Sequence, residues 1–591
     1  MSKPRVLELA LEELNNNPEQ QQAVYASGHC IVLAGPGSGK TKTLTITMAR
    51  LLSDEVKEPR GVACITYNNE CSLELESRLV KLGITTNERV FIGTVHSFAL
   101  TQIISPYARC IPGLLPTDYR IATKVECRTA VVLAYSKVFN DGGDPHQRWR
   151  MAEQKRRQDI DRNLPNWRGR NEELSHFIEA YEAELHHKGL IDFDDMPLIA
   201  YRMVKDHLWI RRALLSRFPI LLVDEYQDLG HALHELVMLL CFEGGIRLFA
   251  VGDADQSIYG FTGANPELLQ ELTFRPDVST VRLRFNYRSG SKIIRGSIGA
   301  LGEERDYRGL DGSAEGEISF CSVQSNIGGQ ATYIAQTLLP HLLSKGIKSE
   351  QIAILYRAAW LGDKVAGALD FTATPYLRTD GNALITRSSK LARFIEACAN
   401  WTTGGWIEAS PTFQRLHREA CSLVYGGSVT DTEKSLLSQQ LMNFLHSGIG
   451  MNEFTHSWLH RFWIELIEPW KLVCRNVHQE WDLCLRLLER TDPKNDQDMP
   501  LNIFAGRIED SGRITLSTLH SAKGREFDAV IMFGVNQNEL PSQRDLQNEK
   551  SLREARRLFY VGVTRPRLYL SFVFQKDFYS PWILDLYNRI K

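Results

Sequence analysis

A glycine-rich segment near the N-terminus has the residue types that phosphate binding needs. Gly35–Thr41 (GPGSGKT) follows the apolar run Ile31–Ala34 and precedes a predicted helix that extends to about Leu52. Glycines let backbone N–H groups close around phosphate oxygens, and a helix start adds partial positive charge. A lysine then reaches the β- and γ-phosphates, and a threonine hydroxyl ligates Mg²⁺. The segment is predicted to be a P-loop, with Ala34 where the pattern usually begins with glycine.

Two adjacent carboxylates follow a second apolar run. Ile220–Val223 reads as a buried strand, and Asp224 and Glu225 come directly after it. One acid can hold Mg²⁺ through water, and the next can orient or deprotonate an attacking water. Two carboxylates at the end of an apolar strand are costly to bury without a cation, which favours a site over a structural pair.

A polar and aromatic loop follows the strand-like run Leu248–Gly252. Gln256 is placed to sense a γ-phosphate, and Tyr259 and Phe261 are aromatics on which bases can stack. One short loop would then contact two ligands, which would let the nucleotide state change the grip on a nucleic acid.

Three further residues suit a nucleotide pocket. Tyr287 offers an aromatic face for adenine, and Arg288 offers a guanidinium for phosphates. The Gln20 amide is both donor and acceptor and can read the adenine edge. A glutamine-rich helix start is equally consistent with a solvated face, so both interpretations of Gln20 remain open.

Polar residues also end two other predicted strands. Val62–Tyr67 leads into two asparagines, and Val90–Phe98 reads as a strand with a polar, aromatic tip that contains Thr94 and His96. Such tips suit sugar–phosphate contacts at the carboxyl edge of a parallel sheet. A lone histidine is more often structural, and the sequence leaves this alternative open for His96.

The overall composition is that of an ordinary globular protein. The chain has 591 residues, 43% of them hydrophobic and 24% charged, and a net charge of −2. This length suggests about four domains. No secretory signal or bilayer-length apolar run is evident. The 11 cysteines form no CxxC pairs, which favours reduced thiols in a cytoplasmic protein over disulfides, zinc or an iron–sulfur cluster.

Tryptophans occur in two contrasting settings. The basic stretch 148–170 is arginine-rich and contains Trp149 and Trp167, which fits either a nucleic-acid surface or a solvated basic loop. The region 396–505 has helical spacing, and its tryptophans are predicted to be core residues; they are Trp401, Trp406, Trp458, Trp463, Trp470 and Trp481.

Taken together, these motifs resemble those of the UvrD/Rep/PcrA-type helicases of superfamily 1A. The matches, in the family's order, are GPGSGKT at 35–41, GTVHSF at 93–98, VDEYQD at 223–228, VGDADQSIYGF at 251–261, NYRS at 286–289, TLHSAKGREFD at 518–528 and RRLFYVGVTR at 556–565. They span nearly the whole chain, and their joint occurrence is far more specific than any one of them.

The resemblance implies an α/β fold with two RecA-like P-loop domains, whose parallel sheets are flanked by helices. Each domain would carry an inserted, mainly helical subdomain. The expected boundaries are domain 1A at 1–98 and 190–279, insertion 1B at 99–189, domain 2A at 280–395 and 506–591, and a short insertion 2B at 396–505.

The resemblance also assigns roles to individual residues, with ATP and Mg²⁺ as cofactors. The catalytic set would be Lys40, Asp224, Glu225, Gln256, Arg288 and Arg565, with the two arginines acting from the second domain and Thr41 and Asp224 serving the metal. The nucleotide-binding set would be Gln20, Gly35, Pro36, Gly37, Ser38, Gly39, Lys40, Thr41, Lys42, Tyr287 and Glu526. Single-stranded DNA would contact Thr66, Asn69, Thr94, His96, Tyr259, Phe261, Thr518 and His520.

Some positions depart from the family pattern. Thr262 stands where the family usually has arginine, Arg525 where it has leucine, and Pro566 where it has alanine. The catalytic positions match the family pattern. These departures, the short 2B insertion and the chain end at Lys591 bear instead on processive unwinding and its regulation.

Two functions therefore compete. The first is an ATP-driven 3′→5′ helicase or translocase that acts on single-stranded or 3′-tailed DNA. The second is an ATP-gated, DNA-sensing subunit that licenses a partner such as a nuclease in a bacterial defence or repair complex. A nucleotide-binding protein without a DNA role is disfavoured by the polar strand ends and the stacking aromatics. The sequence leaves the oligomeric state open.

Overall fold

The chain divides into two compact units in the computed structural model. Unit 1 consists of Met1–Arg288 and Asp306–Leu310, and unit 2 of Ser289–Arg305 and Asp311–Lys591. None of the helices in the described part of the chain is long and apolar enough to cross a membrane. The structure describes residues 4–66, 69–85, 89–116, 119–139, 141–169, 171–260, 263–383, 389–408, 411–425, 429–450, 453–473, 481–493, 499–505 and 512–591.

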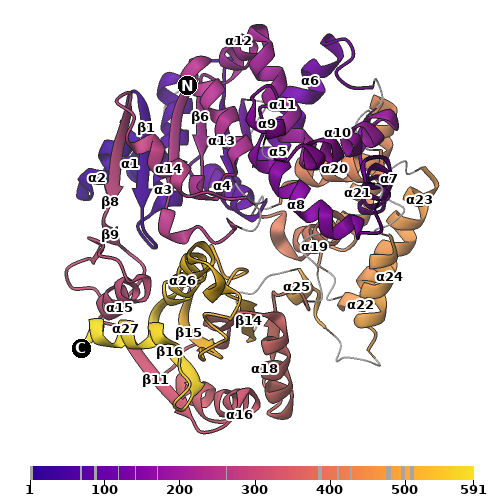
Figure 1. The fold of residues 1–591 in the computed structure, drawn as a ribbon. Helices are drawn as coiled ribbons and strands as arrows, with labels where there is room; N and C mark the ends of the chain where they lie inside the picture. The colour runs from indigo at the N-terminus through magenta and orange to yellow at the C-terminus, as the bar shows by residue number, and fades with distance from the viewer. Residues whose placement is uncertain are drawn as a thin grey trace. The chain divides into compact units, whose positions relative to one another are not determined.

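Unit 1 is built on a six-stranded parallel sheet, ordered β3-β2-β6-β7-β1-β8. Strands β1, β6 and β8 of this sheet are labelled in Figure 1. Most of the strands are nearly continuous apolar runs because helices cover both faces of the sheet. The edge strand β8 differs, with Ser279, Thr280 and Arg282 exposed. Their bounds are β1 His29–Ala34, β2 Val62–Thr66, β3 Val90–Thr94, β6 Ile220–Val223, β7 Arg247–Gly252 and β8 Val278–Leu283.

Alternate side chains of each strand enter two different cores. In β1, Cys30 and Val32 lie in one core with residues of the helices near the N-terminus, and Ile31 lies in the other. This alternation follows from the two-residue period of a strand. The helices of the first core are α1 Arg5–Glu13, α2 Pro18–Val24, α3 Lys40–Arg50 and α4 Asn69–Lys81; those of the second are α5 Val95–Phe98, α11 Asp195–Asp206, α12 Leu208–Arg217, α13 His231–Met238 and α14 Glu267–Thr273.

One predicted strand is shorter than the sequence indicated. The expected strand over 90–98 ends at Thr94, and the helix α5 begins at Val95. The Thr94 side chain accepts a hydrogen bond from the Ser97 N–H at 3.3 Å, which is a helix N-cap. The polar tip of this segment therefore lies on a short helix.

A helical insertion in unit 1 has its own core. Trp167, Phe177 and Tyr181 are among its buried residues. The short strands β4 Arg120–Ile121 and β5 Leu190–Ile191 pair in parallel and join the two ends of the insertion. Its helices are α7 Lys124–Val138, α8 Pro145–Gln158, α9 Asn166–Gly169 and α10 Glu172–His187, and α6 Ser105–Tyr107 precedes them.

Unit 2 contains a second six-stranded parallel sheet, ordered β11-β16-β15-β12-β14-β13. Two parallel sheets flanked by helices confirm the predicted fold class. The strands are β11 Glu317–Val323, β12 Ile352–Tyr356, β13 Tyr376–Arg378, β14 Ile514–Thr518, β15 Phe527–Phe533 and β16 Pro566–Gln575. The accompanying helices are α15 Ser291–Leu301, α16 Ile327–Tyr333, α17 Leu339–Ser344, α18 Ala359–Phe371, α26 Glu549–Val563 and α27 Pro581–Ile590.

The remaining helices of unit 2 share a core of their own, and the predicted core role of its tryptophans is confirmed in part. Trp458 and Trp470 are 0% and 1% exposed and Trp401 is 7% exposed, whereas Trp406 is 45% exposed. The Trp481 side chain lies outside the described residues. These helices are α19 Lys390–Asn400, α20 Phe413–Val424, α21 Asp431–Ser447, α22 Thr455–Phe462, α23 Glu468–Val473, α24 Trp481–Arg490 and α25 Leu501–Phe504.

Candidate active site

The glycine-rich loop connects β1 to α3 in the predicted strand–loop–helix order. Gly37 and Gly39 have φ angles of 69° and 84°, in the left-handed region that favours glycine. The Ser38 hydroxyl donates a hydrogen bond to the Gly35 carbonyl at 2.7 Å. The loop is therefore closed by its own hydrogen bond and requires glycine at two positions.

The Lys40 ammonium is held at the mouth of this loop. Its Nζ donates to the Ala34 carbonyl at 3.2 Å and lies 4.0 Å from Asp253 Oδ2. Asp253 follows β7 and is 4% exposed. Burial raises the pKa of the Asp253 carboxyl, and the Lys40 charge opposes this shift. The pair holds a buried positive charge beside the loop.

Asp224 and Glu225 continue directly from β6. The Asp224 N–H donates to the Ile65 carbonyl at 2.8 Å, and the Asp224 side chain is buried. Burial and the adjacent Glu225 charge raise the pKa of the Asp224 carboxyl, while Lys40 opposes the shift. Glu225 has a φ of 50°, a backbone conformation that is uncommon for a residue other than glycine and is found at functional sites.

Sheet order explains why these groups meet. β6, β7 and β1 are consecutive neighbours, and their carboxyl ends carry Asp224, Asp253 and the phosphate loop respectively. The carboxyl edge of an open parallel sheet is where such folds bind ligands. Asp224, Asp253 and Lys40 are thus neighbours on one edge of the sheet, although up to about two hundred residues separate them in the chain.

Gln227 is a connecting residue that the sequence interpretation missed. It is fully buried, its Nε2 donates to Glu225 Oε2 at 2.5 Å, and its Oε1 accepts the Asp253 N–H at 2.9 Å. Asp253 in turn accepts a hydrogen bond from Gln256 Nε2 at 2.5 Å. The amide joins the carboxylate pair to the loop that carries Gln256. The only sequence signal for it was its place beside the two acids.

The predicted adenine residues lie beside the loop. Gln20 is 4% exposed and its Nε2 donates to the Ser38 carbonyl at 3.1 Å, so the solvated-face interpretation of Gln20 is wrong. The Tyr287 N–H donates to the Gly37 carbonyl at 2.8 Å. Asn17, which the sequence interpretation missed, caps α2 through the Gln20 N–H and donates to the Tyr287 hydroxyl.

Four other predicted residues make contacts of their own. Lys42 Nζ lies 2.6 Å from a Glu13 oxygen on the surface. Arg288 is the last residue of the first segment of unit 1, and its N–H donates to Asn286 Oδ1 at 2.8 Å. In unit 2, the buried Arg565 donates to the Val561 carbonyl at 2.9 Å, and Glu526 pairs with Arg567 at 3.4 Å; the roles of all four remain predictions.

The predicted DNA contacts of unit 1 lie farther along the same sheet edge. Thr66 and Thr94 end β2 and β3 and are partners in register; the Thr66 side chain is buried. The His96 ring stacks on Phe193, with ring centroids 3.9 Å apart, and burial lowers its pKa to about 4, so it is neutral at pH 7.

The other predicted DNA contacts are only partly described. Asn69 begins α4, and its side chain and Phe261 lie outside the described residues. The half-buried Tyr259 accepts the Ala264 N–H on its carbonyl at 3.3 Å. In unit 2, the Thr518 hydroxyl donates to Ser521 Oγ at 2.9 Å, and burial lowers the pKa of His520 to about 4.

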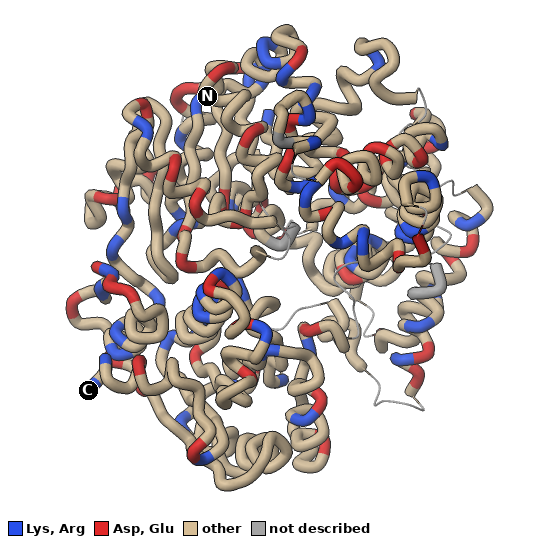
Figure 2. The backbone as a smooth tube through the Cα atoms, in the orientation of Figure 1, with Lys and Arg blue, Asp and Glu red and all other residues tan. Residues whose placement is uncertain are grey.

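Arg156, in the middle of the basic stretch 148–170, lies neither on a nucleic-acid surface nor in a solvated loop. Arg156 is fully buried and donates to Glu182 and Asp192 at 2.8 and 2.7 Å, and it also pairs with Asp195. Trp167 is 2% exposed and belongs to the insertion core. Figure 2 shows basic and acidic residues interspersed along the backbone. Arg156 therefore belongs to the interior of unit 1, whereas Arg150 and Arg168 of the same stretch are exposed.

Two of the departures from the family pattern have local structural roles. The Arg525 guanidinium donates to the Thr379 hydroxyl at 3.3 Å. Pro566 begins β16, where the proline carbonyl accepts the Ser289 hydroxyl at 2.8 Å. A strand start is a position that tolerates the missing N–H of proline. Thr262 lies outside the described residues.

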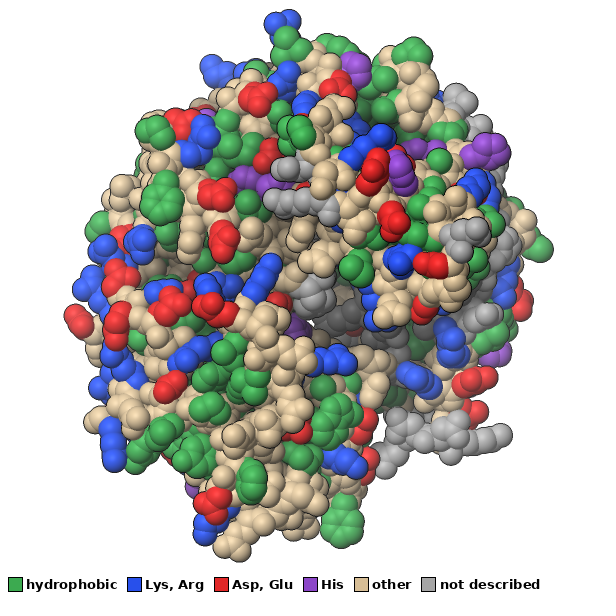
Figure 3. Space-filling view, in the orientation of Figure 1, with side chains coloured by type: hydrophobic (Ala, Val, Ile, Leu, Met, Phe, Trp, Pro, Cys, Tyr) green, Lys and Arg blue, Asp and Glu red, His purple; other side chains and the backbone are tan. Residues whose placement is uncertain are grey.

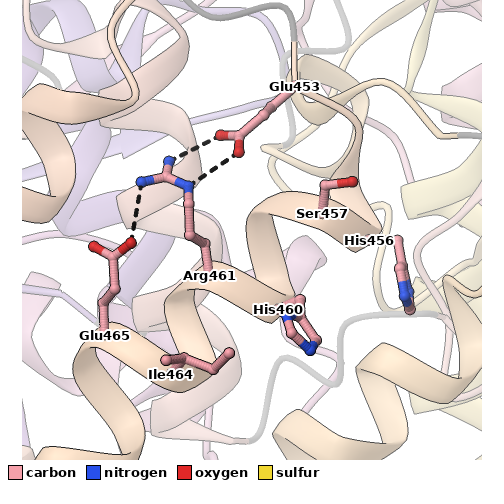
Figure 4. A pocket seen from close by; sticks show the side chains of 7 residues that line it. All are labelled: Glu453, His456, Ser457, His460, Arg461, Ile464 and Glu465. Atoms are coloured by element: carbon pink, nitrogen blue, oxygen red, sulfur yellow. Dashed lines mark hydrogen bonds and ion pairs between the residues drawn. The ribbon is translucent and has the colours of Figure 1, made fainter.

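A surface hollow along α22 contains none of the predicted site residues. Figure 4 shows its lining, in which Arg461 pairs with Glu453 at 2.8 Å and with Glu465 at 3.7 Å. His456 Nδ1 lies 3.2 Å from the Leu488 carbonyl. On the face seen in Figure 3, basic, acidic and apolar side chains are likewise interspersed. In this hollow, Arg461 and His456 already have partners within the protein. The sheet edge of unit 1 is therefore the stronger candidate for the active site.

Comparison with known proteins finds similar proteins over most of the chain. The UvrD/REP helicase N-terminal domain family matches residues 16–276, and the UvrD-like helicase C-terminal domain family matches residues 494–577. The chain is 26% identical to the ATP-dependent DNA helicase Rep of Escherichia coli K12, over 95% of this chain and 91% of the relative. It is 28% identical to DNA helicase II of Salmonella typhimurium, over 97% and 86%, and 27% identical to the ATP-dependent DNA helicase PcrA of Leuconostoc citreum, over 97% and 84%. With its phosphate loop, its paired carboxylates and the two matched domains, the chain belongs to the UvrD/Rep family of helicases.

Proposed function

We propose that this protein is a DNA-dependent ATPase that translocates 3′→5′ on single-stranded DNA and unwinds 3′-tailed duplexes. The observation that carries the proposal is the arrangement of Lys40, Asp253 and Asp224 around the phosphate loop at one sheet edge. The similar proteins are named ATP-dependent DNA helicases, which supports ATP and DNA as the ligands.

The loop and its lysine are suited to the phosphates of ATP. The Ala34 carbonyl and the Asp253 carboxylate hold Lys40 beside the loop, within reach of a bound phosphate. Gly37 and Gly39 have the left-handed backbone conformation that turns N–H groups toward an anion. On the base side, Gln20 and Tyr287 would contact adenine, with Tyr287 held by Asn17.

The donor set fits Mg²⁺. Asp224 and Thr41 supply hard oxygen ligands, and Mg²⁺ is typically held by one or two protein oxygens together with substrate phosphates and water. Burial and Glu225 oppose the charged form of Asp224, so a nearby divalent cation would stabilise that form. When bound, the ion would offset phosphate charge in the transition state.

Water activation and coupling would use neighbouring groups. Glu225 would orient the attacking water, and its carboxylate is positioned by the Gln227 amide. Gln256 would sense the γ-phosphate through the loop that also bears Tyr259. Arg288 and Arg565 would act as arginine fingers, a contribution of ~10³–10⁵ in turnover in other ATPases and GTPases. Hydrolysis would then depend on closure of the two domains.

Single-stranded DNA would run along the same edge. Thr66 and Thr94 are register partners on β2 and β3, next to β6 with its carboxylates, so the proposed DNA track adjoins the proposed ATP site. His96, Tyr259, Thr518 and His520 would contribute further contacts, with stacking on the aromatics and hydrogen bonds to phosphate and sugar.

Unwinding of matched substrates tests the proposal. Three duplexes of identical sequence would carry a 3′ tail, a 5′ tail or blunt ends, and strand separation would be followed by fluorescence with and without ATP. We expect ATP-dependent separation of the 3′-tailed duplex only. Separation of the 5′-tailed duplex would contradict the polarity, and ATP hydrolysis without separation of any duplex would contradict the helicase activity.

A further inference from the structure

Each glycine of the phosphate loop has a side chain packed against the space where its own Cβ would lie. A Cβ atom added at Gly39 would lie 2.5 Å from Gln20 Nε2, and one at Gly37 would collide with Asn286 Oδ1. At Gly35 the added atom would lie 2.5 Å from both Cε1 and Cζ of Tyr307. Real Cβ atoms essentially never approach other atoms so closely, so a side chain presses directly on the loop backbone at each of these three glycines. At Gly37 the Cβ atom of Arg288, 2.7 Å from the added atom, is a second such contact.

The tyrosine contact gives Gly35 a reason to be glycine. Gly37 and Gly39 have positive φ angles, whereas the φ angle of Gly35 is not positive, so its backbone conformation alone does not require glycine. The Gly35 carbonyl accepts the Ser38 hydroxyl that closes the loop. The Tyr307 ring therefore packs on the peptide that anchors the loop's internal hydrogen bond.

Tyr307 reaches the loop on a short segment that returns to unit 1. Residues Asp306–Leu310, here called the return segment, belong to unit 1, whereas the residues on both sides of it belong to unit 2. Within the return segment, β10 Arg308–Gly309 pairs in parallel with β9 Phe285–Asn286, the strand that carries Asn286 to Gly37. Two of the three loop contacts thus come from one two-stranded ribbon.

The third contact is tied to the same ribbon. The Arg284 N–H donates to Glu19 Oε2 at 2.8 Å, and the Arg284 guanidinium lies 2.7 Å from Asp306 Oδ2. Glu19 precedes Gln20 on α2. The helix that carries Gln20 and the ribbon that carries Asn286 and Tyr307 are therefore joined around the phosphate loop by one arginine.

We infer that Tyr307 is a positioning residue of the nucleotide site. Its ring supports the phosphate loop at Gly35, and the loop's affinity for nucleotide phosphates depends on this packing. Because the return segment continues into unit 2 at both ends, displacement of unit 2 can act on the loop through Tyr307. The inference rests on the proposed function, in that it takes the loop to be the ATP site.

A double-mutant cycle between Gly35 and Tyr307 tests the inference. The variants are Gly35→Ala, Tyr307→Ala and the double variant, with Tyr307→Phe as the conservative variant and Leu310→Ala as a control in the same segment. The quantities measured are the KM for ATP, kcat at saturating single-stranded oligonucleotide, and the Kd of Mg·ADP by calorimetry. Thermal melting of each variant shows whether it is folded.

The expected pattern is mutual suppression. Gly35→Ala should weaken ADP binding and raise the KM for ATP by about tenfold or more, because the new methyl group collides with the ring. Tyr307→Ala should raise the KM more than it lowers kcat, whereas Tyr307→Phe and Leu310→Ala should match the unaltered protein. In the Tyr307→Ala background, Gly35→Ala should cost less than threefold, since the colliding ring is gone.

Independent effects would overturn the inference. If Gly35→Ala is equally harmful with and without the Tyr307 ring, or if Tyr307→Phe behaves like Tyr307→Ala, the ring does not position the loop. Failure of the proposed function has a different signature, since the unaltered protein itself would then show no ATP turnover or no duplex separation. The cycle measured by ADP affinity would still test Tyr307 in that case.

Discussion

At the scale of single residues, the site is organised by how a few buried charges are balanced. Lys40 is 11% exposed at its side chain and faces the Asp253 carboxylate, and Asp224 lies on the neighbouring strand. A lysine that serves bound phosphate makes little contribution to the core. Its removal should therefore affect chemistry far more than folding.

We predict that Lys40→Ala abolishes ATP hydrolysis and leaves the protein folded. Turnover by a coupled phosphate-release assay and thermal melting would be measured in parallel. Lys81→Ala, an exposed lysine at the end of α4, is the control and should retain full turnover. Hydrolysis that persists in Lys40→Ala would refute the assignment of the phosphate loop.

Buried histidines predict the acid limb of stability. His234 is 5% exposed beside the Tyr226 hydroxyl, and burial lowers its pKa to about 4, below the value of 6.5 in an unfolded chain. The folded state therefore binds fewer protons, so this contribution is complete above pH 6.5 and is lost as the pH falls toward 4.

We predict that the protonation of His234 on unfolding lowers the free energy of unfolding by about 2 kcal/mol as the pH falls from 7 to 5. His234→Gln should flatten this part of the profile in urea denaturation, whereas His187→Gln, at an exposed position, should not. A profile that is identical in both variants would contradict a neutral, buried His234.

At the scale of elements, sequence patterns predicted what depends on local order. Each of the correctly predicted features is contained in one short stretch of sequence. This holds for the apolar strands, for the loop glycines and for the two acids after β6. Asn17, Gln227 and Tyr307 were missed because each acts through a residue that only the fold brings near, as Asn17 does with Tyr287, which lies 270 positions away.

The basic stretch shows the same limit in the opposite direction. Arg156 looked like a free cation because its partners Glu182, Asp192 and Asp195 lie 26, 36 and 39 positions away. Composition cannot distinguish a cation that faces solvent from one that is surrounded by distant carboxylates. Only the packing of α8 against α10 and the start of α11 makes that distinction.

We predict that Arg156→Ala destabilises unit 1 by about 3–5 kcal/mol, because it leaves Asp192 and Asp195 buried without this cation, whereas Glu182 keeps its pair with Arg162. The matched change Arg168→Ala removes an arginine that is 60% exposed, and should cost less than about 1 kcal/mol. Urea denaturation of both variants would measure the difference. Equal destabilisation would show that the buried ion pairs do not hold the insertion together.

The loop after β7 carries the prediction for DNA coupling. Tyr259→Ala should weaken DNA binding by ~1–3 kcal/mol, as for loss of one base-stacking contact, and should leave the KM for ATP nearly unchanged. The DNA concentration that half-maximally stimulates hydrolysis would report the loss. Phe274→Ala, at a position 85% exposed in the same unit, is the control; identical stimulation in both variants would remove Tyr259 from the DNA track.

At the scale of the whole molecule, the chain has two units, each with its own parallel sheet; the phosphate loop lies in the first unit and the predicted arginine Arg565 in the second. The two matched family domains fall in different units, residues 16–276 in unit 1 and residues 494–577 in unit 2. The proposed DNA contacts include residues of both units. We therefore predict that DNA promotes ATP hydrolysis.

The most direct test of this account is the rate of ATP hydrolysis with and without single-stranded DNA. We expect slow turnover by the protein alone and at least about tenfold stimulation by a single-stranded oligonucleotide, with no turnover in Lys40→Ala under either condition. Turnover that is the same with and without DNA would contradict the central claim that the ATP site and the DNA track are coupled.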